Sequence, residues 1–254
     1  MLTAITHRPS PALSDCELTF ISAQTIDHAR AVQQHADYCH LLRRCGAKVI
    51  ILDKNSDLPD SVFVEDTALV LDEIAIITTM GTQSRRAETE VIATELSRYR
   101  SITRLRLPAQ VEGGDILRIG HTLYVGHSTR TNSEGIKALA EIVEPYGYQV
   151  IDVEVMCCLH LKTGCTALDD HTVLLNPNWI DPQPFAAFDQ IRVPETEPFA
   201  ANILRIGPTI GIHSGFTQTQ ALIKQRGYTL AVTDISEFLK AEAGLTCMSL
   251  IFDA

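Results

Sequence analysis

The sequence predicts an α/β fold in which five units of hairpin, helix and strand (ββαβ) close into a ring, as the blades of a propeller do. The first observation is a repeat, because Ile116-Leu-Arg-Ile-Gly120 recurs as Ile203-Leu-Arg-Ile-Gly207. The second is a helix ending that occurs three times, in which a glycine is followed at once by a strand-like stretch. The third is an unfinished unit at the C-terminus, which needs a strand from elsewhere in the chain.

Four stretches have the pattern of a strand, a tight turn and a second strand, which is typical of a β-hairpin. They begin near Asp66, Asp115, Cys165 and Asn202. Cys247 falls at the corresponding point of a fifth copy, in a short apolar stretch that we expect to be a buried strand. The second strand of this copy is missing, and we expect residues 1–6 to supply it and so close the ring.

The helix endings fix the second half of each unit. Gly46, Gly147 and Gly227 each follow a helical pattern, and glycine takes the left-handed position after a helix without steric cost. We expect helices over residues 29–45 and 88–99, and a third that opens at Asn132 with capping residues. Residues 181–198 are rich in proline and predict only a degenerate helix and a turn. Without a linker, residues 1–254 are expected to form a single domain.

The composition is that of an ordinary globular protein, with 45% hydrophobic and 20% charged residues. The net charge of −10 argues against nucleic acid and anionic membranes as partners and fits a cationic small molecule better. Seven cysteines is an odd number and no secretory signal is present, so we expect reduced thiols and a cytoplasmic location. No apolar run is long enough to span a membrane.

The start of each hairpin is expected to point at the central axis, so residues at this position converge. They are Glu65, Asp66, Glu112, Asp115, His160, Asn202 and Cys247. A cysteine with a distant histidine has the nucleophile-and-base logic of thiol catalysis. Because a free thiol has a pKa of about 8.5, a nearby cation must promote the thiolate, and a bound cationic substrate would supply it. The alternative is a buried cysteine and a hydrogen-bonded histidine that serve only the core.

The acidic residues lie in apolar surroundings, which is costly unless a positive group pairs with them. This favours a binding site for Glu65 and Asp66, although acids at a strand edge facing water remain the alternative. Arg85, Arg86 and Arg130 lie in polar stretches after hairpins, where they could capture a carboxylate or simply be solvated. Acids in the depth of a site with arginines at its rim suit a zwitterion with a cationic tail, such as arginine. The spacing of Cys157, Cys158 and Cys165 fits no zinc pattern, so we interpret them as structural.

Six motifs together resemble the dimethylarginine dimethylaminohydrolases. These are Asp60-Ser-Val-Phe-Val-Glu-Asp66, Ser84-Arg-Arg-Ala-Glu-Thr-Glu90, Val111-Glu-Gly-Gly-Asp115, Arg130-Thr-Asn-Ser-Glu-Gly135, Leu159-His-Leu-Lys-Thr-Gly164 and Thr246-Cys-Met-Ser-Leu250. Their order covers nearly the whole chain. That family belongs to the guanidine-modifying superfamily, so the resemblance implies the five-bladed pentein α/β-propeller, in agreement with the repeat.

The resemblance implies hydrolysis of Nω-methylated arginine to citrulline and a methylamine. Cys247 would attack the guanidinium carbon, and His160 would protonate the leaving amine and then activate water against a covalent thiouronium. Glu112 would orient His160. The resemblance further implies a substrate-binding set, which is Asp66, Glu65, Asp60, Phe63, Arg85, Arg86, Arg130, Leu18 and Ala241. It implies no metal and no organic cofactor.

Arginine deiminases and amidinotransferases are the main alternative, because they resemble this chain in the cysteine, histidine and acid. They carry an Asp two residues after the catalytic histidine, where this chain has Lys162, and this favours the dimethylarginine branch. A non-catalytic receptor for a cationic amino acid is the third hypothesis. The chain departs from the dimethylarginine family at Asp15-Cys-Glu-Leu-Thr19 and at Glu242-Ala243. The sequence leaves a homodimer open.

Overall fold

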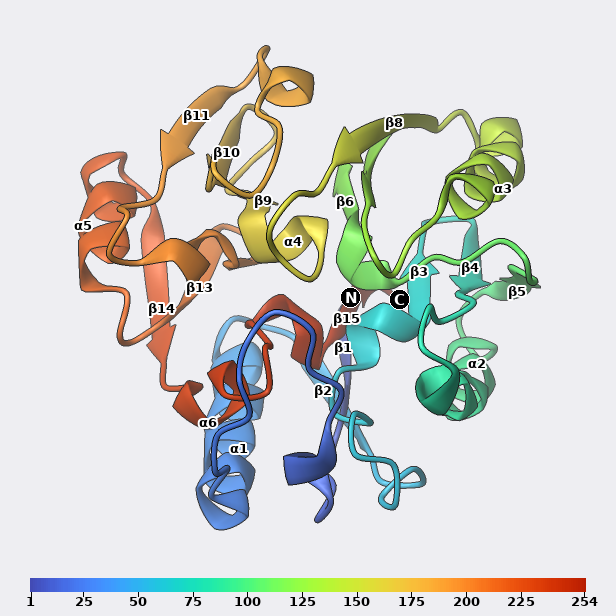
Figure 1. Cartoon of the computed structure of the whole chain (residues 1–254), viewed down its shortest axis with the longest axis horizontal. Helices are drawn as coiled ribbons and strands as arrows, with labels where there is room; N and C mark the ends of the chain where they lie inside the picture. The colour runs from blue at the N-terminus through green and yellow to red at the C-terminus, as the bar shows by residue number, and fades with distance from the viewer.

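A computed structural model describes all residues from 1 to 254. Five three-stranded sheets surround a common centre, and the longer helices lie outside them (Figure 1). In four of the sheets, which we call blades, two antiparallel strands are followed by a third strand parallel to the second. The first blade has β3 (Ala68–Val70), β4 (Ile74–Ile77) and β5 (Ser101–Arg104), and the second has β6 (Ile116–Ile119), β7 (Thr122–His127) and β8 (Gln149–Glu154). The third has β9 (Cys165–Ala167), β10 (Thr172–Leu175) and β11 (Asp189–Arg192), and the fourth has β12 (Leu204–Ile206), β13 (Thr209–His213) and β14 (Thr229–Thr233).

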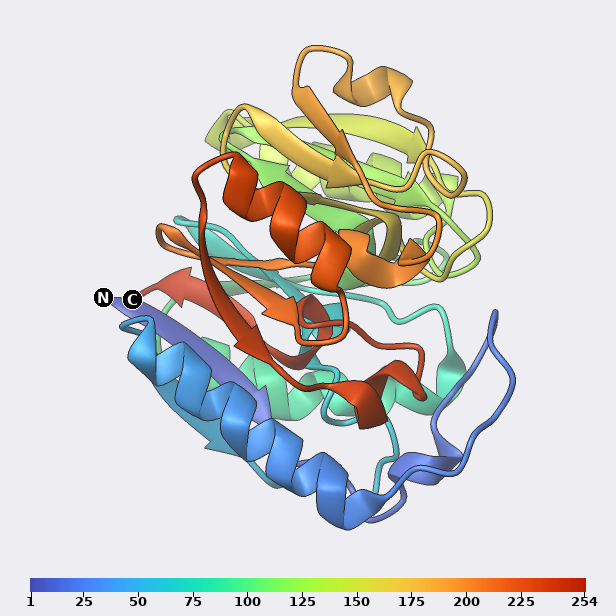
Figure 2. The same ribbon diagram turned by 90° about the vertical axis from the view of Figure 1, so that its left-hand side faces the viewer.

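The fifth blade joins the two ends of the chain, as the sequence predicts. It consists of β15 (Leu250–Asp253), β1 (Leu2–His7) and β2 (Lys48–Leu52). β1 is the central strand, antiparallel to β15 and parallel to β2. The termini lie side by side (Figure 2), and the amino group of Met1 donates to the carbonyl of Ala254 at 3.0 Å. The ring is therefore closed by pairing between the first and the last strand.

The helices agree closely with the positions and end signals predicted from the sequence. The α-helices are α1 (His28–Arg44), α2 (Thr89–Leu96), α3 (Ser133–Val143), α4 (Leu161–Gly164), α5 (Thr217–Gln225) and α6 (Ser236–Leu239). Asn132 caps α3, because its side chain accepts from the backbone N–H of Gly135 at 2.8 Å. Gly46, Gly147 and Gly227 all have positive φ after their helices, as expected. No helix is both long and apolar enough to cross a membrane.

The interpretation of residues 181–198 was wrong in one respect, because this region contains β11. No α-helix precedes the strand, and only the 3-10 helix η6 (Gln183–Phe185) lies between Pro182 and β11. Prolines interrupt the hydrophobic period here, and of the four strand residues only Ile191 is buried. A short strand with one buried side chain leaves almost no pattern in a sequence.

Short 3-10 helices place the residues that converge on the axis. Glu65 and Asp66 lie in η2 (Val64–Thr67), and Cys247 lies in η8 (Thr246–Met248), directly before β3 and β15. The predicted strand position of these residues is therefore wrong. Successive strand residues face opposite sides, whereas a turn lets two adjacent carboxylates lie near one centre. The other 3-10 helices are η1 (Leu13–Asp15), η3 (Gln83–Glu88), η4 (Gly113–Asp115), η5 (Glu144–Tyr146) and η7 (Pro198–Ala201).

Ile5→Ala is expected to lower the free energy of unfolding by about 2–5 kcal/mol. Ile5 is completely buried on β1 and lies opposite Leu250 of β15 and Ile50 of β2. The cavity would therefore weaken the blade that closes the ring. Denaturant unfolding measures this loss. Val32→Ala on the exposed face of α1 is the control and should change stability by about 0.5 kcal/mol or less; equal effects of the two substitutions would contradict the role of β1.

Candidate active site

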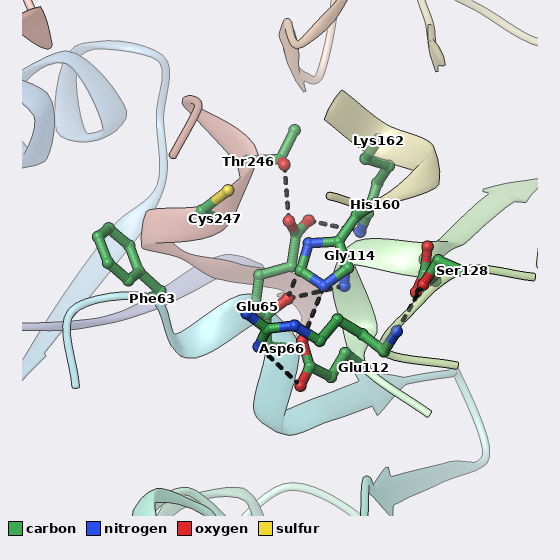
Figure 3. Close-up of polar contacts among 12 residues, drawn as sticks. Phe63, Glu65, Asp66, Glu112, Gly114, Ser128, His160, Lys162, Thr246 and Cys247 are labelled. Carbon is green, nitrogen blue, oxygen red and sulfur yellow. Dashed lines mark hydrogen bonds and ion pairs between the residues drawn. The ribbon is translucent and has the colours of Figure 1, made fainter. Parts of the chain in front are cut away.

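The centre of the ring holds a buried imidazole between two carboxylates. His160 Nε2 lies 2.7 Å from Glu112 Oε2, and His160 Nδ1 lies 3.9 Å from Asp66 Oδ1. All three side chains are almost inaccessible to solvent. They precede the first strands of three different blades: Asp66 lies in η2 before β3, Glu112 lies directly before η4 and β6, and His160 lies directly before α4 and β9 (Figure 3).

The two glycines after Glu112 permit this close approach. A Cβ on Gly114 would lie 2.6 Å from His160 Nδ1 and 2.7 Å from Asp66 Oδ1, and a Cβ on Gly113 would collide with the carbonyl of Glu65. Without a side chain, the Gly114 N–H can donate to Asp66 Oδ1 at 3.0 Å. The Gly-Gly pair is therefore required by the close approach of His160, Asp66 and the Glu65 backbone at this point.

His160 is held in its protonated form. Burial lowers the pKa of this imidazole, but the carboxylates of Asp66, Asp115 and Glu112 outweigh burial and raise it to about 9. Asp66 and Glu112 show the reciprocal effect, because their pKa values are lowered by His160 and Arg85 in spite of burial. At neutral pH the site therefore contains an imidazolium between carboxylates, ready to donate a proton.

Cys247 lies on the other side of this cluster, with Phe63 beside it (Figure 3). Burial, together with the charges of Glu65 and Asp66, raises the pKa of the Cys247 thiol to about 12. The one local donor is the N–H of Gly244, which lies 3.3 Å from Cys247 Sγ. The thiol is thus neutral in the free protein, and a cation placed against it would favour the thiolate.

Lys162 is a site residue whose role the sequence analysis missed. Its Nζ donates to Glu65 Oε1 at 2.5 Å, and Thr246 Oγ1 donates to Glu65 Oε2 at 2.6 Å. Glu65 is therefore occupied on both oxygens by residues that neighbour His160 and Cys247 in the chain. From the sequence, Lys162 was noted only because other families have an Asp at this position. The available signal for a buried acid nearby was a lysine within an apolar stretch, two residues after a candidate histidine.

The arginines are not at a solvated rim. Arg85 is buried in η3, where it donates to Asp66 Oδ2 at 2.8 Å, to Glu88 Oε2 at 2.9 Å and to the carbonyl of Phe63. Arg130 lies in the loop after β7, as expected, but it too is buried. Long side chains that appear polar in the sequence can be drawn inward when buried acids such as Glu88 need a counter-charge.

Arg130 connects the site to Thr19, which lies between η1 and α1. Its guanidinium donates to Thr82 Oγ1 at 2.6 Å and to Thr19 Oγ1 at 3.1 Å, and Nη1 lies 3.5 Å from Glu112 Oε1. Arg86 is half-buried and donates to the carbonyl of Met80. The remaining candidate binding residues surround the cluster: Asp60, Phe63 and Ala241 are buried, and Leu18 is partly exposed.

Asp115 and Asn202 also converge on the axis, but both serve as structural supports. Asp115 accepts from Ser128 Oγ, Thr131 Oγ1 and the N–H of Leu161. The amide of Asn202 donates to the carbonyl of Lys162 and to Thr246 Oγ1. These contacts hold the turns that carry His160 and Cys247 in place.

The three side chains at this centre form the one group in the protein with ligand atoms close enough together for a metal ion. Asp66, Glu112 and His160 offer ligand atoms within 4.8 Å of one another, and no other group of histidine, cysteine and acidic residues does so. In this structure each of them has a protein partner instead: His160 and Glu112 contact each other, and Asp66 accepts from Arg85 and from the N–H of Gly114. All seven cysteines are free, and Cys157, Cys158 and Cys165 are not among the residues grouped closely enough to hold a metal ion.

Comparison with known proteins connects this geometry to one family. A model of the eukaryotic N,N dimethylarginine dimethylhydrolase family matches residues 18–164. The N(G),N(G)-dimethylarginine dimethylaminohydrolase of Pseudomonas aeruginosa is 36% identical over 250 residues, covering 98% of each chain. The chain belongs to the dimethylarginine dimethylaminohydrolase family. The fold is therefore the five-bladed pentein propeller that the sequence predicts.

Two solved structures of dimethylarginine dimethylaminohydrolases superpose closely on this chain. One is a cysteine-to-serine mutant of the P. aeruginosa protein complexed with citrulline, with a TM-score of 0.95, 35% identity and coverage of 99% of this chain and 100% of the other. The second is a histidine-to-glycine variant with an S-methyl-L-thiocitrulline adduct, with the same TM-score, identity and coverage. Membership of this family makes Cys247 and His160 the first residues to test.

Alkylation of Cys247 by a neutral reagent is expected to accelerate with pH up to at least pH 9, without reaching a plateau. The reason is that the thiol of the free protein has its pKa raised to about 12, so the thiolate fraction keeps growing. Labelling rates of the Cys247 peptide between pH 6 and 10, followed by mass spectrometry, provide the measurement. A plateau already reached at acidic pH would contradict the neutral thiol.

Proposed function

We propose that this protein hydrolyses Nω-methylated arginines, namely asymmetric dimethylarginine and monomethylarginine, to citrulline and a methylamine. The observation that carries the proposal is the buried His160, which is hydrogen-bonded to Glu112 and lies near Asp66, with Cys247 on the other side of this cluster (Figure 3). The family relatives support it, since they are named for this activity. Cys247 is the nucleophile of this proposal, and His160 is its acid and base.

The first half of the reaction forms a covalent intermediate. The guanidinium lies between Cys247 and the carboxylates of Asp66 and Glu112, and its charge lowers the pKa of the thiol so that the thiol proton passes to water. The thiolate attacks the guanidinium carbon, giving a tetrahedral adduct. His160 donates its proton to the methylated nitrogen, the C–N bond breaks, and the methylamine departs. A thiouronium bound to Cys247 remains.

The second half releases citrulline. His160 is now neutral and takes a proton from water, whose oxygen attacks the thiouronium carbon. The C–S bond breaks, the hydroxyl proton of the adduct passes to the departing Cys247 sulfur and restores the thiol, and the oxygen stays on carbon as the ureido oxygen of citrulline. Glu112 holds the imidazole in one orientation through both halves, because its Oε2 stays in contact with Nε2. His160 thus gives one proton to the methylamine and regains one from water, and the second proton of that water replaces the one that Cys247 lost.

The rest of the substrate binds around this centre. Asp60 and the backbone near Leu18 take the α-amino group, Arg85 and Arg130 take the carboxylate, and Phe63 and the backbone of Ala241 line the pocket. Glu65 and Arg86 support the binding site without contacting the substrate. Glu65 accepts from Lys162 and Thr246, and Arg86 donates to the carbonyl of Met80. The free cysteines support a cytoplasmic location, and the net charge of −10 supports a small cationic partner over nucleic acid or anionic membrane. Residues 1–254 form one catalytic domain in this proposal, which also allows for a homodimer.

The test is citrulline formation from asymmetric dimethylarginine, monomethylarginine and arginine, each at equal concentration. The proposal expects turnover of the methylated substrates and little from arginine. Lys162 already neutralises the acid that could clamp a second unmethylated nitrogen, so plain arginine loses a contact here. Greater turnover of arginine would assign the chain to deiminase chemistry. Binding of all three without citrulline from any would indicate a receptor.

A further inference from the structure

Glu242 is the one residue other than glycine whose backbone has a positive φ, at 58°. Side chains with a Cβ rarely adopt this conformation, and such strain persists only where the surroundings enforce it. Glu242 is also buried, with 6% of its surface exposed. It lies between Ala241, which lines the proposed pocket, and Gly244, whose N–H contacts Cys247 Sγ. A strained, buried acid therefore lies in the short segment of chain that leads to Cys247.

The carboxylate of Glu242 binds a segment from the other end of the chain. Oε2 accepts the N–H of Thr19 at 2.8 Å, and Oε1 accepts the N–H of Phe20 at 3.0 Å. No arginine, lysine or histidine forms an ion pair with it, in contrast to Asp66 or Glu88. Two backbone donors are thus its only hydrogen-bond partners, and such charge-assisted bonds are about twice as strong as neutral ones.

These donors belong to residues 16–21, which we call the lid segment. The lid segment has no regular structure, and its remaining contacts also reach proposed site residues. The N–H of Glu17 lies 3.3 Å from both oxygens of Asp60, and Arg130 donates to Thr19 Oγ1. Ser84 donates to Glu17 Oε1. Glu242 is the only anchor of the lid segment that comes from the loop carrying Cys247.

We propose that Glu242 is a positioning residue that latches the lid segment over the bound substrate. The inference rests on the proposed function and deepens it. The two hydrogen bonds to the lid segment compensate the strained backbone of Glu242. When the lid segment lifts, the carboxylate loses its only partners and the strain is no longer compensated. Closure is thereby coupled to the Ala241–Gly244 backbone, and so to the placement of Cys247.

The test compares Glu242→Gly and Glu242→Gln with Glu197→Gln. Glycine suits the positive φ but removes the latch, and glutamine keeps one acceptor without the charge. Glu197 is a matched control, because its buried carboxylate also accepts two backbone N–H groups, those of Gln218 and Thr219 at the start of α5. That helix lies at the outer edge of the ring (Figure 1).

Glu242→Gly is expected to keep its melting temperature close to that of the parent, because lost hydrogen bonds and relieved strain offset each other. Its KM for methylarginine should rise about ten-fold, with kcat affected less, and Glu242→Gln should fall between. Amide exchange at Thr19 and Phe20 should accelerate in both. Glu197→Gln should lower the melting temperature and leave KM and lid exchange at parental values.

Two results separate the inference from the function on which it rests. If the parent forms no citrulline, the proposed function fails, and faster lid exchange in the Glu242 variants would still support the latch. If the parent is active and both Glu242 variants keep its KM and its exchange rates at Thr19 and Phe20, the latch is overturned and the hydrolase stands. A fall in melting temperature with unchanged KM would also overturn it, since that is the mark of a purely structural acid.

Discussion

Replacing Cys247 by serine is expected to lower citrulline formation by roughly 10⁴-fold or more while the fold and substrate binding are preserved. A hydroxyl is a far weaker nucleophile than a thiolate, and the positive charge of a bound guanidinium is insufficient to ionise it at neutral pH. Serine is close to cysteine in size and fits the same turn of η8. Steady-state assays with asymmetric dimethylarginine measure the loss, and calorimetric titration measures the retained binding.

Cys45→Ser is the matched control, because Cys45 is also a half-buried free thiol, at the end of α1. Its activity should equal that of the parent. Citrulline formation by Cys247→Ser within ten-fold of the parent would remove Cys247 from the chemistry. Loss of binding together with activity would instead assign Cys247 to the architecture of the pocket.

Glu112→Gln is expected to lower kcat by about 10²–10³-fold and to shift the alkaline limb of its pH profile toward lower pH. The Glu112 carboxylate accepts from His160 Nε2 and helps to raise the pKa of the imidazole to about 9. An amide supplies no negative charge, so the imidazolium would lose its proton at lower pH. A profile of kcat from pH 6 to 10 measures the shift.

Stability should follow the same titration. A histidine whose pKa is raised on folding adds stability below its unfolded value of about 6.5, and that contribution is lost as pH rises through about 9. Glu112→Gln should therefore be most destabilised near pH 6 and least near pH 10. Glu95→Gln is the control. Glu95 is a buried acid of α2 that pairs with Arg98, and this variant should keep the parental pH profile of kcat. An unchanged alkaline limb in Glu112→Gln would contradict the assigned partner of His160.

The fold could be predicted largely because short sequence patterns mark the helix ends and hairpins of each repeat. Glycine at Gly46, Gly147 and Gly227 marks helix ends through backbone geometry that needs no tertiary context. The closing strand could be predicted because an unpaired hairpin strand requires a partner. β11 could not, since one buried residue in four leaves no period, and the 3-10 turn η2 could not, since apolar residues precede it and follow it directly into β3.

The sequence predicts which residues form the site better than it predicts how their charges pair. Repeat position alone places Cys247, His160, Glu112 and Asp66 at one centre, and the structure brings the last three together. The sequence could not show that Arg85 is enclosed by Glu88 and Asp66, because the direction of a long side chain depends on acids distant in the chain. The pairing of Lys162 with Glu65 was hidden for the same reason.

The most direct test is to look for the covalent intermediate itself. His160→Ala removes the group that activates water, so incubation with S-methyl-L-thiocitrulline, whose methanethiol leaves without a proton donor, should trap the thiouronium. Mass spectrometry of the digested protein is predicted to find the adduct on the peptide containing Cys247 and on no other cysteine. Adduct on a different cysteine, or citrulline release by the parent without any adduct on Cys247 in this variant, would contradict the account.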